Sequence, residues 1–168
     1  FLNPEKIVEP TLITDLPSGT RHSKDTENME VIKRDPLDDD ATAAQLVVLL
    51  QDFLALRKGR KFPLGIVVSA WDIVKNDYKF PQDFVKDRLP LLQQYLLSNN
   101  DALFIRYYGV SAQGGSLQSP QEAERLVEQF EDQPLHRILV VDESGAVFHD
   151  ITIPLWEMMN AQTEEELL

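Results

Sequence analysis

Two short apolar runs, each followed by a polar loop, limit the fold more than any other feature of the sequence. The first run, Leu64–Val68 in "PLGIVVSAW", is rich in β-branched residues, as is typical of a strand buried on both faces of a sheet. The second, "ALFIRYYGV", ends at Val110 and predicts another strand. A long segment lies between them, so the two strands are expected to be joined by a crossover rather than by a tight turn.

Helical segments alternate with these strands. Apolar residues at helical spacing predict helices over about 39–57, 81–98, 120–130 and 154–160. Pro90 falls inside the second of these helices and is expected to kink it. A third strand is predicted in "HRILVV", after the third helix. This order predicts an α/β fold with three layers, in which a parallel sheet lies between flanking helices and the crossovers are right-handed.

The two ends of the chain differ from the middle. Residues 1–40 are rich in proline and show little periodicity, which predicts an extended or loop segment. We expect the α/β domain to span 41–160, and an acidic tail to cover 161–168. Phe1 and the residues after it are typical of the interior of a longer chain. A thin sheet of three strands leaves an unprotected edge, so we expect an upstream half or a partner protein to complete it.

Composition excludes several functions. The chain has 168 residues and a net charge of -12, which argues against binding to a nucleic-acid backbone. The acidity is concentrated in 119–168, whereas 41–118 carries more basic than acidic residues and would repel an anionic ligand least. No apolar run approaches the roughly 20 residues of a membrane-spanning helix. Cysteine is absent, which excludes thiolate chemistry and leads us to expect a cytoplasmic protein.

The loops after the first two strands carry the functional signal. In open α/β sheets, ligands bind beyond the carboxyl ends of the strands. Here the first strand is followed by Ser69-Ala70-Trp71-Asp72, and the second by Ser111-Ala112-Gln113 and two glycines. Asp72 is either a hydrogen-bonding ligand or an ordinary aspartate between a strand and a helix. The ring of Trp71 either stacks on a ligand or faces the core.

The two loops resemble the base-recognition half of P-loop GTPases, in which one strand ends in Asn-Lys-x-Asp and the next in Ser-Ala-Lys or a relative. Their counterparts in this chain are "VVSAWD" and "YGVSAQGG". The closing "VFHDITIPLWEMM" is similar to the last helix region of bacterial double-GTPase proteins, which are TRAFAC-type G domains of conflict or defence systems. The resemblance covers roughly 41–160 and implies the C-terminal half of a G domain, a partial P-loop NTPase-like fold.

This resemblance assigns roles to individual residues. Asp72 would accept hydrogen bonds from N1–H and the 2-amino group of guanine, a donor pair that adenine lacks. The backbone N–H of Ala112 would donate to guanine O6, and Ser111 and Gln113 would shape the turn. Trp71 would stack on the base if its ring faces outward. The implied ligands are GTP and GDP with Mg²⁺.

Departures from the family pattern limit what the resemblance implies. Ser69 stands where GTPases have the asparagine that ties the loops together, and Ala70 replaces the lysine that covers the base. No GxxxxGK[ST] sequence is present, so the phosphates have no candidate cradle. No catalytic residue and no metal ligand can therefore be assigned, and GTP hydrolysis would require an upstream phosphate-binding half.

Two hypotheses follow. In the first, the chain is a guanine-nucleotide-binding domain and part of a larger regulatory or defence protein. Asp72 and the intact Ser-Ala turn favour it. In the second, the chain is a degenerate G domain that serves as a non-enzymatic protein-interaction module. The missing phosphate loop and the altered Asn-Lys-x-Asp sequence favour that alternative, because a fold alone does not determine function.

Overall fold

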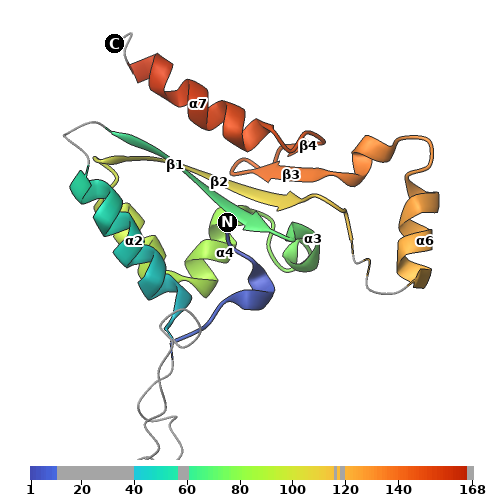
Figure 1. Cartoon of the computed structure of the whole chain (residues 1–168), viewed down its shortest axis with the longest axis horizontal. Coiled ribbons are helices and arrows are strands. Elements are labelled where there is room, and N and C mark those ends of the chain that lie inside the picture. Colours follow the sequence, from blue (N-terminus) through green and yellow to red (C-terminus); the bar gives the residue numbers. More distant parts are fainter. Residues whose placement is uncertain (11–39, 57–60, 116, 118–119, 166–168) are drawn as a thin grey trace, which may run out of the picture.

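The fold is built on a four-stranded sheet, seen in a computed structural model that describes residues 1–10, 40–56, 61–115, 117 and 120–165. The strands follow one another across the sheet in chain order (Figure 1). Their bounds are Phe62–Ser69 for β1, Leu103–Ser111 for β2, Leu139–Asp142 for β3 and Val147–Phe148 for β4. The fold is therefore mixed α/β, as the sequence predicts.

The all-parallel sheet is a wrong prediction. Strands β1 and β2 are parallel, with Phe62 opposite Leu103 and Ser69 opposite Val110. Strands β3 and β4 are antiparallel to their neighbours. The reason lies in helix α6, Pro120–Gln129, which buries none of its residues and lies away from the sheet instead of crossing back over it (Figure 1). The chain therefore re-enters the sheet from the end at which β2 leaves it.

The third strand is also shorter than predicted. Residues Pro134–Arg137 form the 3₁₀ helix η4, so His136 and Arg137 precede the strand and do not belong to it. Proline suits the first position of a helical turn, because its fixed φ matches that turn and the position needs no N–H donor.

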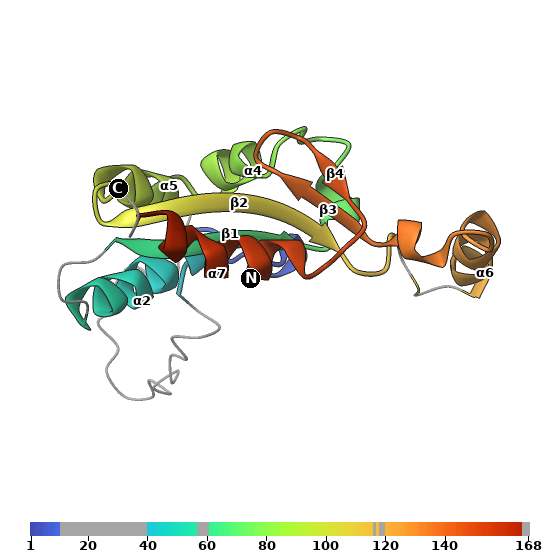
Figure 2. The same ribbon diagram turned by 90° about the horizontal axis from the view of Figure 1, so that it is seen from above.

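Helices flank both faces of the sheet. Helices α2 (Thr42–Leu56), α4 (Pro81–Arg88) and α5 (Pro90–Ser98) cover one face, and α7 (Ile153–Glu165) covers β1 on the other (Figures 1 and 2). The larger core lies under the first three helices, where Leu50, Phe84 and Leu96 pack against Ile66 and Val68 of β1. A smaller core under α7 is formed by the side chains Val67, Tyr108, Val110, Val140 and Met158. Successive strand residues serve opposite cores because their side chains alternate between faces.

The predicted helix over 81–98 is two helices. Leu89 has φ −133° and ψ 55°, which ends α4, and Pro90 begins α5. Proline removes a backbone donor and restricts the residue before it, so the chain breaks here instead of kinking. Leu89 is 1% exposed and fills the core at the break.

The described part of the N-terminal segment is tied to the domain. Leu2 forms a parallel bridge with Val68, and Pro4–Lys6 form the short 3₁₀ helix η1. Val8 exchanges hydrogen bonds with Thr42, since Val8 N–H donates to Oγ1 and Val8 O accepts from Thr42 N–H. Residues 11–39 of the predicted extended segment lie outside the described residues. At the other end, α7 runs through the predicted boundary at 160, and 166–168 lie outside the described residues.

Candidate functional site

The loop after β1 turns the tryptophan into the core. Ala70 adopts a left-handed conformation, with φ 51° and ψ 43°, and the short helix α3 (Trp71–Val74) follows. The Trp71 side chain is 1% exposed and lies over Gly109 of β2, where an added Cβ would come within 2.3 Å of ring atom Cδ2. The sequence left two orientations of the Trp71 ring possible, one stacked on a ligand and one facing the core. The ring faces the core, so it does not stack on a ligand. Instead, the ring packs in the core against Gly109 and anchors the loop after β1 there.

Ser69 ties β1 to the N-terminal segment. Its backbone N–H and its Oγ both donate to Leu2 O, at 2.7 and 3.1 Å. Leu2 N–H in turn donates to Val67 O at 2.7 Å. The serine that stands in place of the GTPase asparagine thus fixes where the η1 turn lies relative to the end of β1.

The loop after β2 is shaped by a buried serine. Ser111 is 2% exposed, and its Oγ accepts a hydrogen bond from the N–H of Gly114 at 2.9 Å. Gly114 has φ +78°, and a Cβ at this position would lie 2.5 Å from Arg137 O. Glycine is required here both by the backbone conformation and by the space. The Ser111 hydroxyl therefore closes the turn, as the resemblance implies for this residue.

These two loops border one cleft of about 620 Å³, which we name the loop cleft. It contains the predicted residues Asp72, Ser111, Ala112 and Gln113. The remaining lining residues are Glu5, Ala70, Ile73, Gly115 and Leu117. The carboxyl ends of two adjacent parallel strands meet at one edge of the sheet, and the loops meet there for that reason.

The electrostatics of the loop cleft favour a ligand with hydrogen-bond donors. The Asp72 side chain is partly buried, and no group among the described residues donates to it. The Ala112 N–H likewise has no acceptor within the described part of the chain. The lining contains two carboxylates, Asp72 and Glu5, and no lysine or arginine. Such a cleft can bind amide, amino or hydroxyl groups, whereas a phosphate would be repelled by the two carboxylates and would find no cationic side chain in the lining.

Glu5 is a charged lining residue that the sequence did not predict. It lies in η1, where the Asn3 side chain accepts from Glu5 N–H at 3.0 Å and Pro4 takes the first helical position. The run Asn-Pro-Glu is itself a helix-start signal, and could have shown that an ordered turn lies within the predicted loop. Nothing in the sequence indicates that this turn lies beside the end of β1.

No metal site emerges from the described residues, where no group of three or more histidine or acidic side chains could hold an ion. Mg²⁺ prefers oxygen ligands, usually one or two carboxylates together with substrate phosphates. The loop cleft has carboxylates but no phosphate-binding group beside them, so it does not fit Mg²⁺ together with the phosphates.

Comparison with protein families decides the broader identity. The family model for Double-GTPase 1 matches residues 1–158. The chain belongs to the Double-GTPase 1 family. No curated protein and no solved structure matches it. Membership in Double-GTPase 1 makes this a GTPase-like domain and implies binding of a guanine nucleotide, usually with Mg²⁺. Within the described residues, no helix is long and apolar enough to cross a bilayer.

Proposed function

We propose that the loop cleft binds the guanine base of GTP or GDP. The observation that carries this proposal is the Asp72 carboxylate, which lacks a donor among the described residues and lies at the carboxyl ends of two parallel strands. A carboxylate can accept from N1–H and from the 2-amino group of guanine at once. Adenine has no such donor pair and would leave the carboxylate unpaired.

The other groups of the cleft complete this recognition. The Ala112 N–H would donate to guanine O6, and it has no acceptor within the described chain. Gln113 is exposed beside it and would border the base. A site built around such hydrogen bonds can reject the wrong base by a factor on the order of 10⁴. The second carboxylate, Glu5, would suit the ribose hydroxyls, which are also donors.

The phosphates and Mg²⁺ would be bound by a half of the G domain that completes the sheet. The sequence lacks a GxxxxGK[ST] loop, and no lysine or arginine side chain lines the loop cleft. Strand β1 offers an attachment edge, since Leu2 bridges it at Val68 and no other described residue pairs with its outer side. An apolar groove of about 310 Å³ runs beside this edge, with Leu46, Phe53 and Phe62 in its wall. Hydrolysis would depend on that half, which would make this chain one part of a larger regulatory or defence protein.

A non-enzymatic interaction module is the second candidate. It is supported by the missing phosphate loop and by a cleft whose side chains carry only negative charge. In that case the cleft would not bind nucleotide, and the apolar groove at β1 would serve protein contact alone.

A titration separates the two. Fluorescent GDP, GTP and ATP in Mg²⁺ would be titrated against the chain, alone and within the longest natural protein that contains it. We expect guanine-selective binding that Asp72→Asn weakens about 100-fold, because a neutral amide loses one acceptor and the charge. The same variant should gain affinity for the xanthine nucleotide, since the amide N–H can donate to the 2-oxo group of xanthine.

The matched control is Asp101→Asn, which removes one carboxylate before β2, at the end of the strand away from the cleft. It should bind guanine nucleotides like the wild type. Gain of xanthine binding would also exclude misfolding as the cause of the loss. Absence of guanine-selective binding in both forms of the protein would refute the nucleotide proposal and favour the interaction module.

A further inference from the structure

The first half of β2 has an open edge. Phe62 N–H donates to Ala102 O, so the alternating ladder directs the backbone groups of Leu103, Ile105 and Tyr107 away from β1. Strand β3 pairs only with Tyr108 and the residues after it (Figure 2). Glu143 is the one described residue that reaches this edge, where its Oε2 accepts weakly from Tyr107 N–H at 3.4 Å. The outward groups of Leu103 and Ile105 have no partner among the described residues.

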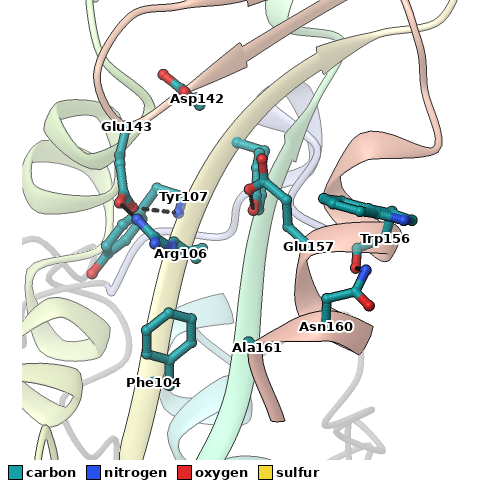
Figure 3. A pocket seen from close by; sticks show the side chains of 10 residues that line it. Phe104, Arg106, Tyr107, Asp142, Glu143, Trp156, Glu157, Asn160 and Ala161 are labelled. Atoms are coloured by element: carbon teal, nitrogen blue, oxygen red, sulfur yellow. Dashed lines mark hydrogen bonds and ion pairs between the residues drawn. The ribbon is translucent and has the colours of Figure 1, made fainter. Parts of the chain in front are cut away.

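A cleft lies on the sheet face beside this edge. It has a volume of about 230 Å³, and we name it the α7 cleft. Figure 3 shows Phe104 and Arg106 on its floor, the Glu143 turn on one side and α7 with Trp156, Glu157 and Asn160 on the other. On this face Met158 of α7 packs against Val67, Tyr108 and Val110, whereas Phe104 and Arg106 are only half-buried and line the cleft.

The polar groups of the α7 cleft are tied to the strand and to each other. Arg106 forms an ion pair with Glu143, which raises the pKa of the guanidinium, and its Cζ lies 5.0 Å from the centre of the Phe104 ring. Tyr108 OH donates to Glu157 Oε2 at 2.5 Å. Burial, and then this hydrogen bond, raise the pKa of Tyr108 above its ordinary value. These contacts hold the walls of the cleft in place.

The charge left over in the α7 cleft is negative. Three carboxylates, Asp142, Glu143 and Glu157, face one cation, and that cation is already paired. Glu157 Oε1 and Asp142 Oδ2 have no donor among the described residues. The Trp156 ring is 66% exposed beside them, and an exposed indole attracts cations over its face. An anion would be repelled here, whereas a lysine or arginine side chain would gain two kinds of contact.

From the open edge and the charge of the adjacent cleft, we infer that the first half of β2 binds an extended segment of a partner protein that carries basic side chains. The segment adds as a further strand along Leu103–Tyr107, where β3 is absent. Its backbone pairs with the outward groups of Leu103 and Ile105, and takes the Tyr107 N–H that Glu143 now occupies. Basic side chains on the face toward α7 reach Glu157 and Trp156. Main-chain hydrogen bonds supply affinity in this mode, and the side-chain contacts select the sequence.

The other edges of the sheet are less suited to such a partner. Strand β4 has only two residues. The outer edge of β1, which we assign to the other half of the G domain, is already bridged by Leu2 at Val68 and carries Pro63, which has no N–H to donate. Natural sheets usually protect long edges with prolines, charges or covering segments, because an unpaired edge binds other chains. Among the described residues, only the Glu143 side chain forms a hydrogen bond with the outward backbone groups of Leu103–Tyr107.

Labelled octapeptides test this inference on the full chain by fluorescence anisotropy. The probe alternates valine with arginine, and its acidic counterpart alternates valine with glutamate. We expect the basic peptide to bind at least tenfold more tightly than the acidic one. Two further versions of the basic peptide carry N-methyl groups, one on every valine and the other on every arginine, so that each blocks one edge of the added strand. At least one should bind about tenfold more weakly, since two or three backbone hydrogen bonds are lost.

Variants of the chain then locate the site. Glu157→Gln, which keeps a side chain able to hydrogen-bond to Tyr108, should weaken the basic peptide several-fold. The matched control Glu128→Gln removes one carboxylate from the exposed face of α6 and should leave binding unchanged. Equal binding of the parent and both methylated peptides would overturn the inference, because attraction to net negative charge does not require a free edge. Equal effects of the two variants would overturn it as well.

Discussion

The two halves of β2 differ in how completely their backbones are bonded. From Tyr108 to Val110 the strand pairs with β1 on one side and β3 on the other, and Ser111 pairs with β3. The side chains of Tyr108, Val110 and Ser111 are 6% exposed or less. From Leu103 to Tyr107 it pairs with β1 only. The change occurs at Tyr108, which lies opposite Asp142, the last residue of β3.

This difference gives the halves different uses. In the second half every outward backbone group has a strand partner, so recognition falls to the loop beyond it, where Ala112 and Gln113 lie beside Asp72. In the first half the backbone itself is available, and the adjacent side chains only select among partners. A small ligand with few atoms needs the fixed loop, whereas an extended chain needs the open edge.

Amide hydrogen exchange should show the largest contrast. The N–H groups of Gly109 and Ser111 point toward β3 and lie within paired strands, whereas those of Leu103 and Ile105 point to the open edge. We expect the first pair to exchange at least 100-fold more slowly, because their exchange requires the ladder to open. Exchange measured by NMR on the folded chain gives each rate directly. Similar protection of all four amides would mean that the edge is covered and that the two halves do not differ.

Substitution of Gly109 should have the next largest effect. In Gly109→Ala the new Cβ would lie 2.3 Å from Trp71 Cδ2, so the buried ring would be forced out of its place in the core. We expect a loss of about 3 kcal/mol in the free energy of unfolding, measured by urea denaturation. Trp71 emission should shift to longer wavelength as its ring is displaced.

Gly65→Ala is the matched control on the neighbouring strand. Its Cβ would meet Met158 Cγ at 3.1 Å, but a methionine side chain is flexible and can shift. The expected loss is below about 1 kcal/mol. If the two substitutions cost the same, the close fit between Gly109 and Trp71 does not hold the loop after β1.

The sequence predicted the parallel part of the fold and the meeting of the two loops. The run Leu64–Val68 identified β1, and the ends of parallel strands meet whatever their loops contain. The antiparallel direction of β3 could not be predicted from the sequence. The apolar pattern of α6 resembles that of a crossover helix, although none of its residues is buried. The orientation of the Trp71 side chain could not be predicted either, because it is set by a residue far away in the sequence. It depends on the missing side chain of Gly109, which lies on another strand.

The open edge and Glu5 were missed because neither leaves a local signal. The edge arises where β3 stops, and β3 stops at the turn after Asp142, which has ordinary turn residues. Glu5 reaches the loop cleft only through the pairing of Leu2 with Val68, two residues far apart in the chain. Both features result from long-range pairing, which periodicity and motif spacing do not contain.

The smallest predicted effect concerns Asp142, where the two halves of β2 meet. Burial raises the pKa of this carboxyl, but hydrogen bonds from Ser144 and from the backbone of Ala146 outweigh it, so the pKa lies below its ordinary value. A carboxyl whose pKa is lowered by folding stabilises the folded state above its unfolded pKa. That contribution is lost as the pH falls through the folded pKa.

Asp142→Asn keeps an acceptor oxygen and removes only the charge. At neutral pH we expect it to lower the free energy of unfolding by about 0.5 kcal/mol, since the group is largely solvated. The difference from the wild type should shrink toward zero below the ordinary carboxyl range, where Asp142 of the wild type becomes protonated too. Urea denaturation between neutral and acidic pH measures both curves. In the same variant, amide hydrogen exchange should speed up more at Gly109 than at Ser111. Gly109 lies closer to the end of β3, and loosening the turn after Asp142 would free β2 from that end first. A difference that stays constant with pH would show that the charge of Asp142 does not stabilise the folded state.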